Sequence, residues 1–159
     1  MGGRSKALAK QFAAKAEEAM VVLERLSDAD WNEVTETEKW TVGVTAHHLA
    51  SALEAVASMV TAIVSGQPRG HFTRAMLDEM NAQHAQEHAH CTRAETTALF
   101  RKGATAAAAL VRGLPDEQLA KSGTVFTDAL PMTVEQVITS ALIGHIDAHV
   151  GSIRRTIGT

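Results

Sequence analysis

Residues 133–157, TVEQVITSALIGHIDAHVGSIRRTI, decide the fold and contain the first candidate site. Residues four apart lie above one another on a helix, so the spacing His145-x-x-x-His149 puts two imidazoles on one face. A projection at about 100° per residue places both histidines in the middle of an apolar arc. That arc comprises Val134, Val137, Ile138, Ala141, Leu142 and Ala148. Buried imidazoles need partners for their nitrogens, and a divalent metal is the simplest partner.

Three further segments repeat apolar residues at spacings of three and four, which is typical of helices. They cover about residues 5–26, 42–64 and 73–112, and the last is long enough to bend or break near Gly103. The pattern predicts an all-α fold, an up-and-down four-helix bundle made by one domain over residues 1–159. Residues 124–129 are expected to pair briefly within a loop. The expected core positions of the first two segments are Leu8, Phe12, Ala16, Ala19, Leu23 and Leu26, and Val42, Ala46, Leu49, Leu53, Val56 and Val60.

The composition is that of a soluble globular protein, with 45% hydrophobic and 21% charged residues. The net charge of −3 gives no basic surface for nucleic acid or anionic membranes. We expect no nucleic-acid and no membrane partner, because no apolar run approaches the roughly 18 residues of a membrane span. Cys91 is the single cysteine, which excludes an internal disulfide. Together with the absence of a signal peptide pattern at the start, it predicts a cytoplasmic protein.

The second helical segment carries two adjacent histidines, His47 and His48. The projection places His48 at the edge of the apolar face and His47 opposite that face, where it is expected to be solvated. His48 therefore joins His145 and His149 as a candidate metal ligand. Three histidines with an open fourth position describe a catalytic rather than a structural zinc site. The alternative is that these are core histidines hydrogen-bonded to backbone or water.

The third segment contains a stripe whose ends are apolar and whose centre is polar. If this stripe faces the bundle interior, Asn81, His84 and Glu95 are candidate proton carriers or substrate-orienting residues. His84 and His88 form a second pair four residues apart, which fits either a second metal or a solvated, hydrogen-bonding role. The stripe comprises Leu77, Asn81, His84, His88, Cys91, Glu95, Leu99, Lys102, Ala106 and Leu110.

Small residues recur in the last segment at Ala141, Gly144, Ala148 and Gly151. Glycine inside a helix costs about 1 kcal/mol relative to alanine. Its use predicts the close approach of a neighbouring helix, either within the bundle or across a homodimer. Cys91 is expected to be a small packed residue rather than a nucleophile.

Three stretches resemble a known family. KWTVGVTAHHLASALEAV and PMTVEQVITSALIGHIDAHVGSIRR resemble its tryptophan-led second helix and its last helix, and LDEMNAQHA resembles the start of its third helix. The family is the DinB-like, YfiT-like superfamily, which includes the N-terminal domain of mycothiol-dependent maleylpyruvate isomerase. The resemblance implies a four-helix bundle in which His48, His145 and His149 hold Zn²⁺ or Ni²⁺.

Family members with known activity include low-molecular-weight-thiol S-transferases, isomerases and metal-dependent hydrolases. The resemblance therefore implies thiol-dependent chemistry on a small-molecule electrophile, with mycothiol as a candidate cofactor. Maleylpyruvate isomerase has a further C-terminal domain, whereas this chain is expected to be the helical domain alone. The alternatives are a non-catalytic stress protein that binds a metal or small ligand, and a hydrolase that uses metal-bound water.

Overall fold

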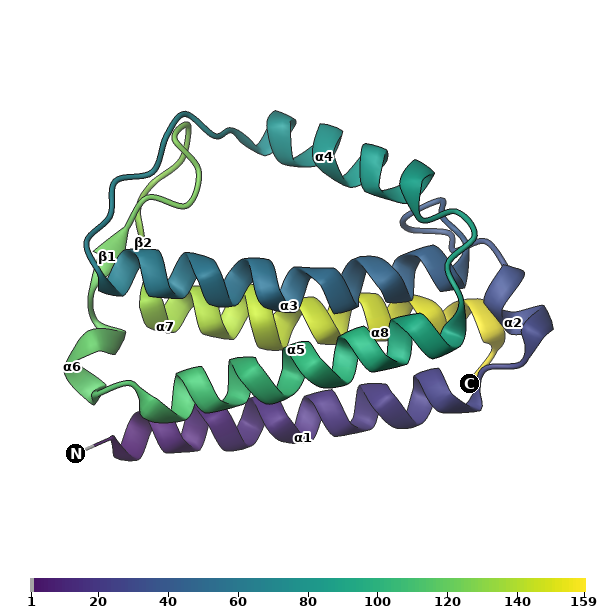
Figure 1. Cartoon of the computed structure of the whole chain (residues 1–159), viewed down its shortest axis with the longest axis horizontal. Coiled ribbons are helices and arrows are strands. Elements are labelled where there is room, and N and C mark those ends of the chain that lie inside the picture. The colour runs from purple at the N-terminus through teal and green to yellow at the C-terminus, as the bar shows by residue number, and fades with distance from the viewer. Residues whose placement is uncertain (1) are drawn as a thin grey trace.

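Four long helical segments lie side by side in the computed structural model, which describes residues 2–159 (Figure 1). They are α1 (Gly3–Arg25), α3 (Val42–Val64), α5 (Arg93–Gly113) and a continuous run of α7 (Val134–Val137), the π-helix η1 (Ile138–Ile143) and α8 (Gly144–Ile157). Helix α5 packs against both α1 and α3, and α8 also packs against these two helices. The predicted all-α bundle is confirmed.

Short elements connect these segments. They are α2 (Asp28–Asn32), α6 (Asp116–Leu119), β1 (Ser122–Gly123) and β2 (Met132–Thr133). The two strands pair antiparallel, with Ser122 opposite Thr133. The pairing expected within residues 124–129 is thus wrong by a few residues, because the paired residues flank that loop rather than belong to it.

Threonines begin the helices that build the site. The side chains of Thr41, Thr73, Thr92 and Thr133 each accept a hydrogen bond from a backbone N–H in the first turn of α3, α4 (Arg74–Glu87), α5 and α7. Such caps satisfy donors that have no partner within the helix. The predicted Thr133–Gln136 capping box is confirmed, and a second box joins Thr92 to Glu95.

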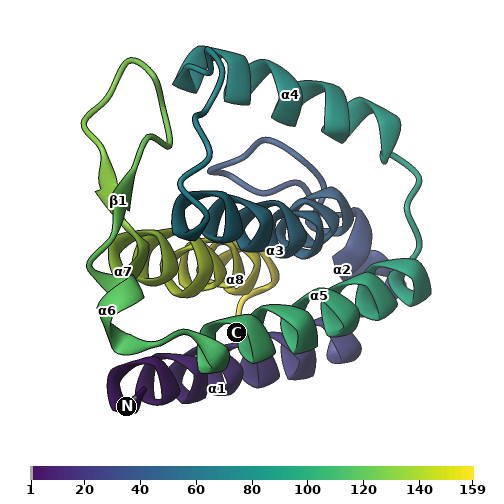
Figure 2. The same ribbon diagram turned by 60° about the vertical axis from the view of Figure 1, so that its left-hand side comes forward.

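The segment 73–112 is not one helix but two, α4 (Arg74–Glu87) and α5. The break lies at residues 88–92 rather than near Gly103, where α5 is continuous. Contacts with α2 and with the start of α3 hold this turn: the Trp31 indole of α2 donates to the Cys91 carbonyl at 3.1 Å, and the Cys91 thiol donates to the Gly43 carbonyl of α3. Helix α4 lies outside the bundle and carries the chain back, so that α3 and α5 run in the same direction (Figures 1 and 2). The four bundle helices therefore do not alternate in direction as the predicted up-and-down topology requires.

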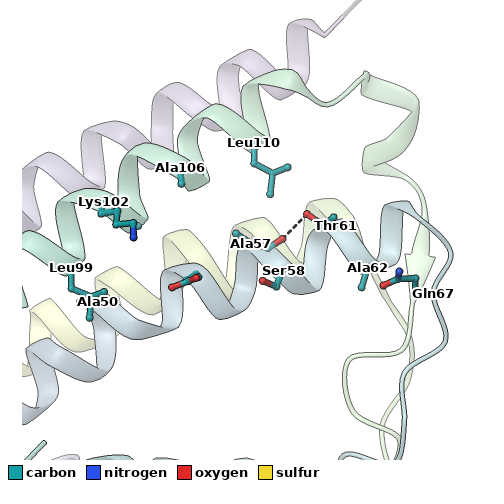
Figure 3. A pocket seen from close by; sticks show the side chains of 12 residues that line it. Ala50, Ala57, Ser58, Thr61, Ala62, Gln67, Leu99, Lys102, Ala106 and Leu110 are labelled. Carbon is teal, nitrogen blue, oxygen red and sulfur yellow. Dashed lines mark hydrogen bonds between the residues drawn. The ribbon is translucent and has the colours of Figure 1, made fainter.

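All core positions expected for α1 and α3 are buried. The expected face of α5 is wrong, because the break before α5 changes the helical phase. The buried residues of α5 are Thr96, Phe100, Ala107 and Val111. Its expected stripe instead lines an outer groove of about 420 Å³ between α3 and α5, shown in Figure 3, to which it contributes Leu99, Lys102, Ala106 and Leu110.

The π-helix η1 changes the face that α8 presents. A π-turn holds one more residue than an α-turn, so residues after it are rotated relative to a uniform projection. Ala148, expected in the core, is exposed, and Ile146, Val150 and Ile153 are buried instead. His145 and His149, each one position before a core residue, are only partly buried.

The small-residue stripe does not mark a close helix contact. A Cβ on Gly144 would meet the Thr139 carbonyl of its own helix, and one on Gly151 would meet only the Arg155 guanidinium. The close approach lies elsewhere, at Gly103 of α5, where a Cβ would stand 3.1 Å from that of Leu53 on α3. The stripe therefore marks no close helix approach within the bundle, and the alternative contact across a homodimer stays a prediction.

Helix α3 is long and apolar enough to cross a membrane by length and composition, with a mean hydropathy of 1.3 in its most apolar window. The expectation that no apolar run approaches a membrane span is therefore wrong. Helix α3 packs against α5 on one side and α8 on another. Eight of its apolar positions belong to the core, namely Val42, Ala46, Leu49, Ala50, Leu53, Val56, Val60 and Ile63. This arrangement is typical of the central helix of a soluble bundle.

Candidate metal centre

His48 of α3 meets His145 and His149 of α8 at the edge of the core. One nitrogen from each ring lies within 4.8 Å of the others, a grouping suited to a metal ion. The Nε2 atoms of His48 and His145 are 3.2 Å apart. Two nitrogens bound to one tetrahedral zinc at 2.0–2.1 Å would lie about 3.3 Å apart. The donor set and its spacing therefore fit a divalent metal held by three imidazoles.

Glu38 orients His149, a residue pairing that the sequence analysis missed. The Oε1 atom of Glu38 lies 2.9 Å from His149 Nδ1, and the Ser152 hydroxyl donates to Oε2 at 2.6 Å. A carboxylate on Nδ1 fixes the tautomer whose Nε2 lone pair is free for a metal. The side chain of Glu38 is only 8% exposed, so this interaction is shielded from solvent.

A tight turn places Glu38. Thr35 and Trp40 are joined by a backbone hydrogen bond of 2.8 Å, and Val34 forms an isolated bridge with Thr41. Lys39 adopts a left-handed conformation with φ of 65° to close the turn, which is uncommon for a residue with a side chain. This strained position directs the preceding carboxylate toward α8.

Two of the three ligand imidazoles, those of His48 and His145, are kept neutral by their surroundings. Burial, followed by the charges of neighbouring histidines, lowers the pKa of His48 to about 3 and that of His145 to about 4. Burial alone would raise the pKa of Glu38, but hydrogen bonds from Ser152, Thr35 and His149 lower it below its ordinary value. At neutral pH, neutral nitrogens thus face one another beside an ionised carboxylate, which suits a cation.

The triad lines a cavity of about 670 Å³ between the bundle and α4. This volume lies within the usual range for small-molecule sites. Asn81 and His84 of α4 line the same cavity as the triad, as the polar stripe predicts. Its other lining residues include Trp40, Ser51, Met59, Arg69, Phe72, Arg74, Asp78, Met80, Phe126 and Ser140.

Glu95 is placed differently from Asn81 and His84. It is exposed, and its carboxylate accepts from the Thr92 N–H as part of the α5 cap. It does not line the cavity. The sequence pattern placed it on the same stripe as His84 because residues 73–112 were expected to form one helix. Cys91 is half-buried and burial raises the pKa of its thiol, in keeping with the packed role expected for it.

His47 is buried, so the expectation that it is solvated is wrong. It faces α4. Its Nδ1 lies 3.0 Å from His84 Nε2, and its ring stacks on His88 with centroids 4.0 Å apart. Burial, followed by the charges of His88 and His84, lowers the pKa of His47 to about 4. The helical projection failed because α4 covers this face of α3.

Comparison with known proteins gives one family. The family described as mycothiol maleylpyruvate isomerase N-terminal domain, which is DinB/YfiT-like, matches residues 12–139. No significant match is found among curated proteins. The family match includes His48 and Glu38 and ends before His145, so the last two ligands rest on the geometry above. Because the match covers most of the sequence, this chain belongs to the mycothiol maleylpyruvate isomerase N-terminal domain family.

Proposed function

We propose that the chain holds Zn²⁺ or Ni²⁺ at His48, His145 and His149 and catalyses thiol-dependent transfer or isomerisation of a small electrophile. The observation that carries this proposal is the triad's position in the wall of a cavity of about 670 Å³. Three protein ligands leave a fourth position for a substrate or cofactor. When bound, the metal would ionise the thiol of a cofactor such as mycothiol, because a coordinated thiol is deprotonated.

The cavity walls support catalysis on a small molecule. Trp40, Met59, Met80 and Phe126 supply apolar surface, which excludes water and strengthens polar interactions inside. Asn81 and His84 lie on α4, across the cavity from α8 and its two ligands. Their amide and imidazole groups would orient the electrophile.

Two arginines favour an anionic electrophile. Arg69 lies over the ring of Phe72 at 4.3 Å, and Arg74 lies over Phe126 at 4.5 Å. Both line the cavity, with Asp78 as the acidic residue beside them. The Arg69 Nε is buried and has no hydrogen-bond partner among residues 2–159. The two arginines carry two positive charges and Asp78 carries one negative charge. A carboxylate on the substrate would accept a hydrogen bond from the Arg69 Nε–H and would balance the remaining positive charge.

Cobalt substitution tests the thiol step. Metal-free protein loaded with Co²⁺ is titrated with mycothiol, and the absorption spectrum is recorded for a sulfur-to-cobalt charge-transfer band. The band should appear and saturate at one thiol per triad in the wild type and in His90→Ala, an exposed control. His145→Ala should not show it. A cobalt-loaded triad without this band, with mycothiol, bacillithiol and glutathione alike, would contradict the thiol mechanism and favour the hydrolase alternative.

A further inference from the structure

A second group of three imidazoles lies on the opposite side of the adjacent histidine pair. His47 of α3, His84 of α4 and His88 at the end of α4 each offer one nitrogen, and these nitrogens lie within 4.8 Å of one another. The Ser51 hydroxyl is 3.2 Å from His84 Nε2 and 3.4 Å from His47 Nδ1. It donates to the His47 carbonyl, so its oxygen lone pairs are directed toward the rings.

This group repeats the arrangement of the first triad. His84 and His88 are four residues apart on α4, with ring centroids 4.4 Å apart and planes at 40°. His145 and His149 on α8 show 4.4 Å and 45°. Each pair is completed by one member of the adjacent pair on α3: His47 for α4 and His48 for α8. The two groups differ in their third ring pair, because His47 stacks on His88 with planes at 21°, whereas His48 meets His149 at 80°.

Hydrogen bonding alone does not satisfy this second group. One N–H···N bond can join His47 and His84 across their 3.0 Å contact. The other nitrogen of His84, Nδ1, is buried and has no partner among residues 2–159. An imidazole nitrogen buried without a partner costs about 1–3 kcal/mol. A metal bound at Nε2, the nitrogen that faces His47, would not itself partner Nδ1, so the case for a metal rests on the spacing of the three rings.

Helix α4 has few other contacts that would hold it against the bundle. Within its described residues 74–87 no side chain is buried, and the helix stands away from the other long helices (Figure 2). Apolar packing therefore contributes little to its position. Through His84, the second histidine group joins the C-terminal end of α4 directly to α3.

We propose that His47, His84 and His88 bind a second divalent transition metal, of which Zn²⁺ is the test ion, and that this metal fixes α4 as the wall of the cavity. Neutral imidazole nitrogens suit zinc, nickel and copper better than magnesium or calcium. His84 also lines the cavity, so this site would set the position of one cavity wall. The inference concerns a different set of ligands from the triad and holds whatever reaction the triad serves.

Zinc stoichiometry tests this site separately from the first. Metal-free protein is titrated with Zn²⁺ against a chromophoric chelator. The wild type and His90→Ala should each bind two equivalents, whereas His88→Ala and His145→Ala should each bind one. If His145→Ala binds none while the wild type binds one, the second site does not exist and the triad stands. If His88→Ala still binds two equivalents, the proposed ligands are wrong.

Hydrogen exchange provides a readout that does not depend on counting metal. At zinc concentrations about 100 times the dissociation constant, a metal that binds only the docked helix lowers the population of the open state by about 100-fold. Backbone amides of residues 74–87 should be protected to this extent by Zn²⁺ in His145→Ala, which retains only the second site. Equal exchange of these amides with and without Zn²⁺ would overturn the proposal.

Discussion

Replacing Glu38 by glutamine should weaken metal binding at the triad by about tenfold. The carboxylate accepts from Ser152 at 2.6 Å and pairs with His149 Nδ1 at 2.9 Å. Glutamine keeps the shape, and its amide oxygen can still accept from Nδ1–H, so the tautomer is retained. The charge is lost. Hydrogen bonds to charged groups contribute about 1.5–3 kcal/mol and neutral ones about 0.5–1.5 kcal/mol, a difference of about 1.4 kcal/mol, or tenfold.

The assay is competition for Zn²⁺ between metal-free protein and a chelator of known affinity. The measurement is made in the His88→Ala background, so that only the triad is titrated. Glu36→Gln is the matched control, because Glu36 is an exposed glutamate in the same turn. Glu38→Ala removes both the charge and the hydrogen bond, and should approach a 100-fold loss. Equal affinities for Glu38→Gln, Glu38→Ala and Glu36→Gln would refute the assigned role of the carboxylate.

Two further predictions concern the metal-free fold. The folded-state pKa values of His48 and His145, about 3 and about 4, lie below the ordinary 6.5, so the unfolded chain binds more protons than the folded chain between these values. The melting temperature of chelator-treated protein should therefore fall as the pH drops from 6.5 toward 4. A melting temperature that does not change with pH, or an equal slope in the double variant His48→Asn/His145→Asn, would contradict this. Gly43→Ala should destabilise the protein by about 1–3 kcal/mol in urea unfolding, because a Cβ there overlaps the Trp31 indole, whereas Gly151→Ala, which meets only the flexible Arg155, should be neutral or stabilising by up to about 1 kcal/mol; equal effects would show that the contact is unimportant.

The sequence was sufficient for the helices whose signals are local. Helices α1 and α3 show unbroken spacings of three and four, so their buried faces follow from the period. The triad could be predicted because His145 and His149 are one turn apart and His48 lies at the edge of an apolar face. These relations depend on helix geometry and require no knowledge of long-range contacts.

The features that were missed depend on contacts between distant segments. The end of α4 is set by Trp31 and Gly43, which are far from Cys91 in the chain. The π-helix has no residue signature, yet one extra residue moved Ala148 out of the core. Glu38 is one of several glutamates in its loop, and only the left-handed Lys39 and the partner on α8 distinguish it.

The most direct test of the metal centre is anomalous diffraction at the zinc edge from crystals of the zinc-loaded protein. The account predicts a peak about 2.0–2.1 Å from one nitrogen each of His48, His145 and His149, with the fourth position open to the cavity lined by Asn81 and His84. An absent peak in zinc-loaded crystals would contradict the metal centre. A peak enclosed by four protein ligands would contradict its catalytic role.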